Sequence, residues 1–338
     1  MKRNITYCLC LIVAFLTFSC EKADEYTSSP RENFEALWKI MDEHYCFFEY
    51  KDVDWNEIHD RYSVQITDTM KQDKLFDVLG NMLNELKDGH TNLISAFDIS
   101  RYWKWYEDYP ANFSVDIQDL YLGTDYQIAG GLKYKKLNND VGYVYYSSFS
   151  DAVGETNLDY MFLYFKECKA IIFDVRDNGG GSLTYSDRIA SRFLEEKITT
   201  GYILHKTGTG HNDFSAPYEL TLAPSDRVRW LRPVIVLTNR HCFSATNDFI
   251  NKMGMMPHAT IMGDRTGGGS GFPFSSELPN GWSVRFSASP MLNASNEHTE
   301  FGIDPDIKVD MTSEDMLRGK DTMIDEALAL IEKMNIKI

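Results

Sequence analysis

The chain is short of cysteine, of positive charge and of long apolar runs, and each shortage excludes a class of protein. Only six of its 338 residues are cysteines, and three of these, Cys8, Cys10 and Cys20, lie near the N-terminus. The other three are widely spaced, so we expect no disulfide framework and a fold that rests on its apolar core. Lys and Arg number 34 against 50 Asp and Glu, a balance that argues against nucleic acid and anionic membrane surfaces as partners.

The N-terminus carries the features of a secretory signal. Two basic residues precede apolar residues 9–18, and Cys20 follows. The stretch resembles a bacterial lipoprotein signal, in which the cysteine is lipidated and becomes the mature N-terminus. We therefore expect residues 1–19 to be a signal peptide, Cys20 to carry a lipid and residues 20–30 to be a tether. No later run reaches the roughly 18 apolar residues of a membrane helix, so we expect attachment by the lipid alone.

Such a signal implies the cell envelope of a diderm bacterium. The expected location is the outer membrane, facing the periplasm or the exterior. The sequence leaves open which leaflet the lipid reaches.

Helical and strand patterns alternate along the body of the chain, which predicts an α/β layered fold. Apolar residues recur at helical spacing in five segments, residues 33–45, 75–86, 157–167, 185–194 and 321–334. Short apolar runs predict strands at residues 141–149, 170–175, 234–237 and 260–262. No internal repeat or low-complexity tract interrupts this order.

Three regions follow from these patterns. We expect an N-terminal helical subdomain over residues 31–95 and a larger α/β core over residues 140–338. Between them, residues 96–139 are rich in tyrosine and tryptophan and alternate in polarity, so we expect a small insert of short strands and loops.

Residues 234–250, with the sequence VIVLTNRHCFSATNDFI, present a serine where a buried strand gives way to a helix. Backbone N–H groups at the start of that helix lie beside Ser244 and can stabilise an oxyanion, as nucleophilic acyl transfer requires. A helix cap formed by Ser244 or Thr246 would produce the same pattern. Cys242 is an alternative nucleophile, although its neighbours suggest a residue packed at the end of the strand.

Two further clusters lie where predicted elements end. DVRDNGGG at residues 174–181 follows a strand, and its glycines free the backbone to bring N–H groups against a ligand. A phosphate cradle is disfavoured because neither a following Lys-Ser/Thr nor a GxGxxG spacing is present, while a plain glycine-rich turn stays possible. DGHT at residues 88–91 follows a helix, and its His90 could accept a proton from a hydroxyl or serve only a structural role.

Together, these clusters resemble the C-terminal-processing, or tail-specific, serine peptidases of family S41, which also contain the tricorn core protease. Six motifs of that family occur here in the family's order: DGHT at 88–91, VGYVYYSSF at 141–149, DVRDNGGG at 174–181, FSATND at 243–248, GDRT at 263–266 and FGIDPDI at 301–307. Each motif is weak alone, but the ordered set is specific. The resemblance implies a crotonase/ClpP-like layered α/β core and serine peptidase activity on extended or unfolded polypeptides.

Two departures from the family pattern refine this expectation. The processing peptidases use a lysine as base shortly after the GDRT segment, but Gly269 occupies that position here. The tricorn-like branch instead uses a histidine at the position of His90 and an assisting glutamate, for which Glu300 is the first candidate and Glu297 the second. In addition, the 50 residues between Thr91 and Gly142 are too few for the family's PDZ domain.

The resemblance thus implies a Ser/His/Glu site formed by Ser244, His90 and Glu300. The N–H groups of Gly180 and Ala245 would form the oxyanion hole. No metal ion and no cofactor is expected, since the other histidines lack ligand spacing, and the implied partner is a polypeptide substrate. A catalytically inactive lipoprotein that binds a peptide or another ligand is the alternative, and the oligomeric state stays open.

Overall fold

The computed structural model describes residues 28–137, 140–334 and 336. The expected signal peptide, Cys20 and most of the expected tether lie outside these residues. Among the helices that are described, none is long and apolar enough to cross a membrane.

Helices form where the sequence supplies both an apolar face and a cap. In α2, Ser29 accepts a hydrogen bond from the N–H of Glu32, and Pro30 takes the first helical position, which tolerates its missing N–H. The helices are α2 (Pro30–His44), α3 (Trp55–Ser63), α4 (Gln72–Asn84), α5 (Val115–Leu122), α6 (Glu155–Tyr164), α7 (Leu183–Ala190), α8 (Ala245–Met253), α9 (Ser313–Leu317) and α10 (Thr322–Lys333), with short 3₁₀ turns η1 (Lys104–Tyr106) and η2 (Ser191–Phe193).

A seven-stranded sheet forms the centre of the larger lobe. Its strands, in spatial order, are β13 (Ile307–Lys308), β10 (Ala259–Gly263), β9 (Val234–Thr238), β6 (Ala170–Asp174), β5 (Val141–Tyr146), β4 (Leu132–Leu137) and β3 (Gln127–Ala129). The strands from β13 to β5 are parallel, and β4 and β3 add an antiparallel edge. All residues of β6 and β9 are buried, as expected for parallel strands covered on both faces.

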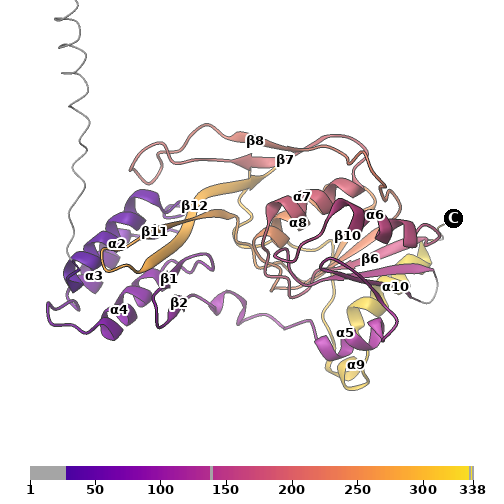
Figure 1. Ribbon diagram of the computed structural model, residues 1–338, viewed down its shortest axis with the longest axis horizontal. Helices are drawn as coiled ribbons and strands as arrows, with labels where there is room; N and C mark the ends of the chain where they lie inside the picture. The colour runs from indigo at the N-terminus through magenta and orange to yellow at the C-terminus, as the bar shows by residue number, and fades with distance from the viewer. Residues whose placement is uncertain (1–27, 138–139, 335, 337–338) are drawn as a thin grey trace, which may run out of the picture.

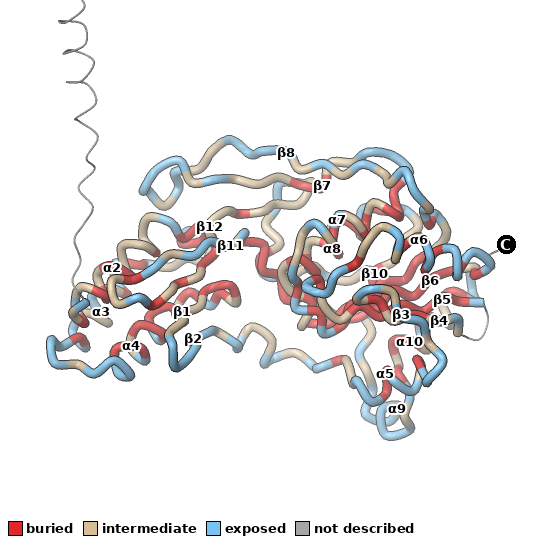
Figure 2. The backbone as a smooth tube through the Cα atoms, in the orientation of Figure 1, coloured by how far each residue is buried: buried red, intermediate tan, exposed pale blue. Residues whose placement is uncertain are grey.

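Helices cover both faces of this sheet, which makes a three-layered core (Figures 1 and 2). Phe173 of β6 points to the face covered by α6, α7 and α8, whereas its neighbour Ile172 points to the face covered by α5 and α10. This alternation follows from the two-residue period of a strand. The predicted α/β layered fold is therefore confirmed.

The N-terminal helices α2, α3 and α4 pack on a second sheet, which forms the smaller lobe (Figure 1). Its strand order is β2 (Ile99–Arg101), β1 (Asn92–Ile94), β12 (Ser283–Asn293), β7 (Ile198–Ile203) and β8 (Tyr218–Leu222), and β11 (Gly271–Glu277) also pairs with β12. Val284 and Phe286 of β12 enter the same apolar cluster as Leu79 of α4. Strands from late in the chain thus complete the lobe that the first helices begin.

Residues 96–139 differ in part from the expectation of short strands and loops. Residues 96–137 of this segment are described, and they form no PDZ domain. The segment contains β2, η1 and the strands β3 and β4 at the antiparallel edge of the large sheet. It also contains the helix α5. Ser114 caps that helix by accepting from the N–H of Ile117, and Gly123 ends it at φ 65°. The serine and the glycine around an apolar stretch are the usual start and stop signals of a helix, and the aromatic richness of the segment obscured them.

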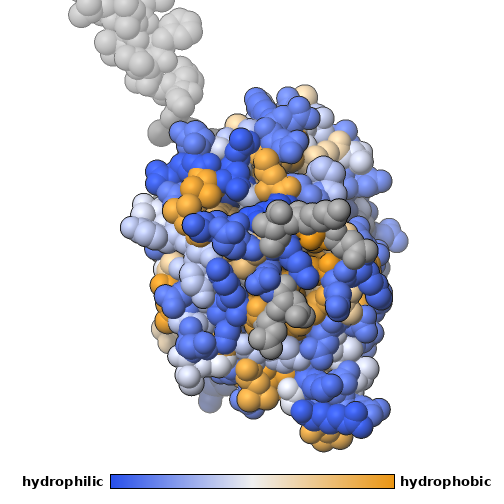
Figure 3. Space-filling view, turned by 90° about the vertical axis from the view of Figure 1, so that its right-hand side faces the viewer, coloured by the Kyte–Doolittle hydropathy of each residue, from blue (hydrophilic) through white to orange (hydrophobic). Residues whose placement is uncertain are grey.

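The end of the molecule formed by the larger lobe is mostly hydrophilic. Figure 3 shows apolar groups on this face only as separate patches among polar side chains. A surface of this kind suits a chain with a net charge of −16, because charge excess keeps a protein soluble.

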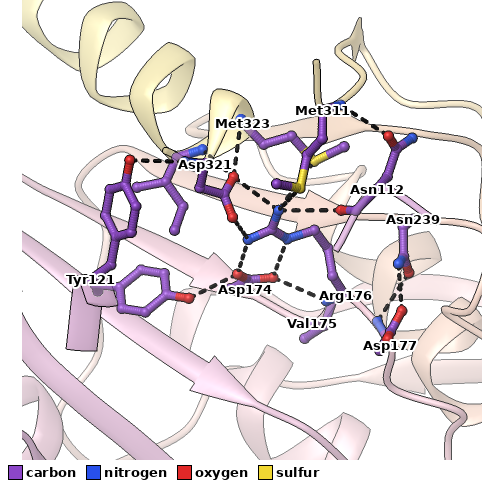
Figure 4. A network of polar contacts seen from close by, with 12 residues as sticks. Asn112, Tyr121, Asp174, Val175, Arg176, Asp177, Asn239, Met311, Asp321 and Met323 are labelled. Atoms are coloured by element: carbon purple, nitrogen blue, oxygen red, sulfur yellow. Dashed lines mark hydrogen bonds and ion pairs between the residues drawn. The ribbon is translucent and has the colours of Figure 1, made fainter. Parts of the chain in front are cut away.

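Arg176, which follows β6, is fully buried and ties the last helix to the sheet (Figure 4). Its guanidinium donates to both carboxylate oxygens of Asp174 and to both of Asp321, at 2.6–3.0 Å. Asp321 also caps α10 by accepting from the N–H groups of Met323 and Ile324. One arginine therefore holds the glycine-rich loop after β6 against the C-terminal helix.

Removing one charge from this cluster should strongly destabilise the fold. Asp321→Asn keeps a capping side chain but leaves Arg176 short of a buried counter-charge, so we expect the free energy of unfolding to fall by about 3–5 kcal/mol. Urea denaturation measures the change. In the matched control, Glu314→Gln, an exposed ion pair with Arg318 is lost, and the expected change is at most about 0.5 kcal/mol. Equal effects of the two substitutions would contradict a structural role for the Arg176 cluster.

Candidate active site

Ser244 lies in a strained turn between β9 and α8. Its backbone adopts φ 59° and ψ −120°, which is costly for a residue with a side chain and is typical of functional positions. Its N–H donates to the carbonyl of Gly268 at 2.8 Å, so the turn is fixed by the loop that follows β10. Although Ser244 occupies the cap position of α8, its hydroxyl makes no capping hydrogen bond. The hydroxyl is therefore available for another partner.

That partner is His90, whose Nε2 lies 3.0 Å from the Oγ of Ser244. The DGHT turn between α4 and β1 brings the ring from the smaller lobe to the serine turn of the larger lobe. The N–H of His90 donates to Oδ1 of Asp88 at 2.8 Å, which fixes the backbone of the turn. Nδ1 makes no hydrogen bond of ordinary geometry to any described residue, although the backbone of Gly271 lies nearby.

Burial keeps His90 neutral. The ring is almost completely buried, and the loss of water lowers its pKa to about 4, although the nearby carboxylate of Asp88 acts in the opposite direction. Since a neutral imidazole has one free nitrogen, it can accept the proton of a hydroxyl at neutral pH.

Aromatic rings hold the serine turn and the histidine in place. The ring of Phe243 packs against that of His90 with centroids 4.8 Å apart. Trp105 of η1 stacks on the ring of Phe243 at the same centroid distance. Trp105 belongs to the segment predicted as an aromatic insert, so this segment supports the site through its contact with Phe243.

The ring of Phe243 also leaves no space for a side chain at position 269. Gly269 adopts φ 79°, and a Cβ at this position would lie 2.4 Å from the ring of Phe243. A lysine side chain could enter only if that ring moved away from His90. The Gly269 position and the histidine packing are thus two aspects of one arrangement.

A network of buried charges lies behind His90. Lys51 donates to Oε1 of Glu300 at 2.9 Å and lies 3.4 Å from Oδ2 of Asp88. That same oxygen of Asp88 accepts hydrogen bonds from the hydroxyls of Tyr45 and Ser287. Two buried carboxylates therefore share one buried ammonium group.

The pKa values in this network follow from burial and from these pairings. For Lys51, burial lowers the pKa, but the two carboxylates outweigh it and raise the pKa above its ordinary value. Burial likewise opposes ionisation of Asp88, yet Lys51 and His90 hold its pKa below the usual range. Burial raises the pKa of Glu300, and Lys51 offsets this only in part. Lys51 is consequently a cation and not a base.

The two candidate glutamates lie in different surroundings. Oε2 of Glu300 accepts from the N–H of Ser270 at 2.8 Å, so its carboxylate links Lys51 to a loop that lines the site. None of the hydrogen bonds among the described residues joins it to His90. Glu297 is exposed and accepts from the side chain of Asn293. Glu300 is therefore in the network behind the histidine, and Glu297 is outside it.

The glycine loop approaches the serine turn closely. At Gly180, whose φ is 96°, a Cβ would lie 2.5 Å from the carbonyl of Phe243 and 2.9 Å from the N of Ala245. Only glycine fits such an approach. The N–H of Gly180, however, donates to Oδ1 of Asn178 at 3.0 Å. The amide that the sequence assigns to an oxyanion hole is thus beside the serine but is engaged within its own loop.

The alternative nucleophile and the alternative cap take structural roles. Cys242 is fully buried, its thiol donates to the carbonyl of Val175, and burial raises its pKa far above the usual range. A thiol in that state is a poor nucleophile. The hydroxyl of Thr246 donates to Oδ1 of Asn178, which supports the glycine loop.

A cavity of about 230 Å³ opens beside Ser244 and His90. Its walls are mainly apolar and come from both lobes, with Leu183, Leu220, Phe272, Pro273, Met291 and Leu292 among the lining residues. Arg285 and Asp248 are the charged side chains that line it. A cavity of this kind beside a nucleophile can accommodate part of a substrate.

Serine hydrolases on several folds present a serine to a histidine in this way. The sequence profile of peptidase family S41 matches residues 140–309, and that of the tricorn protease C1 domain matches residues 26–84. The chain belongs to peptidase family S41.

Individual relatives agree with this assignment. The crystal structure of a protein from Parabacteroides merdae ATCC 43184, described as a candidate peptidase, is 69% identical, has a TM-score of 0.87 and covers 90% of this chain and 97% of that one. The tricorn protease of Thermoplasma acidophilum is 27% identical over 205 residues, which are 60% of this chain and 18% of that protein.

More distant similarities show the fold alone. Mature CPAF has a TM-score of 0.69 at 13% identity, covering 92% of this chain and 99% of that one. A protein of Chlamydia trachomatis is 28% identical over 138 residues, which are 38% of this chain. In each of the curated relatives that match, the matched region spans only 18–23% of the relative's length.

Sequence reasoning did not single out Lys51, Asp88, Trp105 or Arg285. Asp88 stood within the DGHT motif, two residues before His90, and could have been weighed as its carboxylate partner. The other three residues carry no local signal in the sequence. Lys51 lies in the loop before α3, Trp105 in η1 and Arg285 in β12, and they reach the site only when the lobes assemble.

The neutral state of His90 should make the fold sensitive to acid. Its pKa in the folded protein is about 4, against roughly 6.5 when unfolded, so the unfolded chain binds more protons between these values. Stability should therefore fall as the pH is lowered through this window, and we expect His90 to account for a loss of about 2 kcal/mol between pH 7 and pH 5. Urea denaturation of wild type and His90→Gln at both pH values measures this.

The His90→Gln variant should lose less stability on acidification than wild type. His44→Gln, which replaces an exposed histidine, should retain the wild-type loss. An identical loss in wild type and His90→Gln would show that burial does not depress the pKa of His90.

Proposed function

We propose that this chain is a serine endopeptidase that hydrolyses peptide bonds of extended or unfolded polypeptides. The observation that supports this most strongly is the 3.0 Å contact between Oγ of Ser244 and Nε2 of a buried His90. Membership of peptidase family S41 supports the same reaction class. The proposal assigns the chain to the branch that uses a Ser/His site instead of a Ser/Lys site, since Gly269 leaves no room for a lysine.

In the proposed reaction, Ser244 attacks the carbonyl carbon of the scissile bond while His90 accepts the hydroxyl proton. His90 then donates that proton to the leaving amine, and an acyl-enzyme forms at Ser244. Water attacks the acyl group with His90 again as base, which releases the carboxylic acid and restores the serine.

The buried carboxylates have a defined part in this sequence of steps. The imidazolium that forms on His90 is costly in a buried site, as its low pKa shows. The negative charge of Asp88 lowers this cost, because that carboxylate raises the pKa of the ring. Glu300 acts at one remove, through Lys51, which it shares with Asp88. The assisting role expected for Glu300 is therefore proposed as an indirect one.

The proposed oxyanion hole consists of the N–H groups of Ala245 and Gly180. Ala245 begins α8, where N–H groups have no partner within the helix. The N–H of Gly180 must leave Oδ1 of Asn178 to take part. Glycines on both sides of it, Gly179 and Gly181, make such a rotation of the peptide inexpensive. Loss of one such donor typically lowers turnover by about 100-fold to 1000-fold.

We also propose that the mature protein is a lipoprotein of a diderm cell envelope, anchored through Cys20. The supporting observation is the sequence of residues 1–20, with basic residues, an apolar run and a cysteine. In that location the substrate would be a polypeptide of the envelope or the exterior. A lipid on Cys20 would attach the protein to the membrane without requiring its acidic surface to bind anionic lipid head groups.

Labelling with a fluorophosphonate probe tests the peptidase proposal. The probe should label wild type, and Ser244→Ala should neither be labelled nor cleave casein, with activity at least about 1000-fold lower. Ser63→Ala, which changes a serine of α3 far from the site along the chain, should behave as wild type. Absence of labelling in wild type would instead support a lipoprotein that binds peptides or other ligands without cutting them.

Metabolic labelling with a fatty acid tests the anchor. Expressed from its full sequence in a diderm bacterium, the wild-type chain should incorporate the label and fractionate with membranes. Cys20→Ala should lose both properties, whereas Cys46→Ala, which alters a buried cysteine of the body, should retain them. Membrane association of Cys20→Ala equal to that of wild type would exclude Cys20 as the anchor.

A further inference from the structure

Arg285 occupies an unusual position in β12. Its neighbours Val284 and Phe286 are buried in the apolar cluster beneath the N-terminal helices. Since successive side chains of a strand point to opposite faces, Arg285 emerges on the other face, where it lines the cavity that contains Ser244 and His90. Ser287, on the same face, donates to Asp88, so this face of β12 is directed toward the site.

The guanidinium of Arg285 has no hydrogen-bond or ion-pair partner in the part of the chain that the structure describes. The buried arginines differ, since Arg176 and Arg192 each bind two acidic residues and Arg240 donates to backbone carbonyls. Arg285 is half-buried, and burial lowers its pKa. A guanidinium removed from water without hydrogen-bond partners is costly, and sites that bear such a cost are often binding sites.

The nearby carboxylates do not neutralise the guanidinium of Arg285. Asp88 contributes a favourable charge, but its oxygens are engaged by the His90 N–H, by two hydroxyls and by Lys51. Asp248 also lines the cavity, yet it accepts from Lys252 and Ser186. The cavity of a strongly acidic chain thus presents an arginine whose donors are unused.

The other walls of the cavity indicate which ligands could accept hydrogen bonds from the guanidinium of Arg285. They are mainly apolar, so they favour a group that has an apolar body and one anionic end. A carboxylate matches a guanidinium particularly well, because its two oxygens accept from two parallel N–H donors. Within a polypeptide, an Asp or Glu side chain and a free C-terminus both supply this group.

We propose that Arg285 binds a carboxylate of the polypeptide substrate, and thereby directs cleavage to peptide bonds close to an acidic side chain or a free C-terminus. This inference rests on the proposed function, since it assumes that the cavity beside Ser244 receives a substrate. It makes Arg285 a determinant of specificity, separate from the groups that perform the proton transfers.

The test compares wild type with Arg285→Gln. Cleavage sites in casein, mapped by mass spectrometry, first identify a peptide that wild type cuts. That peptide is then made in four forms, with its Asp and Glu residues kept or replaced by Asn and Gln, and with a free or an amidated C-terminus. Wild type should cleave one carboxylate-bearing form faster than its neutral counterpart, and Arg285→Gln should lose roughly 10-fold to 100-fold in kcat/KM on that form alone.

The four forms distinguish the source of the carboxylate. Dependence on the side chains identifies an acidic residue as the ligand, and dependence on the terminus identifies the chain end. The loss should lie mainly in KM, and Arg285→Lys should recover part of it, since lysine keeps the charge but not the paired donors. Arg101→Gln, which removes an exposed arginine of β2, a strand separated from β12 by β1, should match wild type on all four peptides.

Binding to an inactive protein gives a second readout. Ser244→Ala should bind the preferred peptide more tightly than its neutral form, and Ser244→Ala combined with Arg285→Gln should bind both equally. If wild type cleaves casein but Arg285→Gln keeps the wild-type preference among the four peptides, the assignment of Arg285 is wrong. If wild type is neither labelled by a fluorophosphonate nor cleaves casein, the proposed function has failed instead.

Discussion

The contact between His90 and Ser244 is the constraint on which the rest of the site depends, because the two residues belong to different lobes. They are 154 positions apart in the chain, and each lobe fixes one of them through its own backbone. A shift of about 1 Å between the lobes would separate the two side chains, and errors of that size are costly in catalysis. β12 opposes such a shift, since it pairs with β1 beside the histidine and with β7, which leads back to the larger lobe.

Charge is distributed differently inside the molecule and on its surface. The surface carries the acidic excess of the chain, while the interior next to the serine holds Lys51 and Arg285. Lys51 is paired with both Asp88 and Glu300 beside a neutral imidazole, although burial raises the pKa of Glu300 to about 7 and so favours its neutral form. Arg285 lines the cavity beside Ser244 and His90. A buried histidine between a carboxylate cluster and an arginine is therefore exposed to opposing fields, and the site's proton affinity is set by their balance.

The parts of this arrangement that could be predicted from the sequence are those with a local signal. Buried parallel strands such as β6 and β9 are continuous apolar runs, and Ser244 and His90 stand in short motifs of recognisable order. The strands β7, β8, β11 and β12 were not foreseen, because their pairing is set by contacts distant in sequence and their polarity alternates weakly. The same reason applies to Lys51 and Arg285, whose meaning depends on what surrounds them. The engagement of the Gly180 amide is a matter of peptide orientation, which composition does not encode.

The buried Arg176 cluster also limits the order in which the molecule can assemble. Arg176 belongs to the loop that carries the glycines beside Ser244, and its second carboxylate, Asp321, follows 145 residues later in the chain. During synthesis from the N-terminus, the serine turn, the histidine turn and the glycine loop all exist before this carboxylate does. Until α10 docks, the guanidinium has only Asp174 as a buried counter-charge, and its loop is held only by contacts such as those of Asp177 with Asn239 and of Asn178 with Tyr146. A nascent chain that has not yet reached Asp321 would therefore carry every residue of the site without the last contact that fixes its glycine loop.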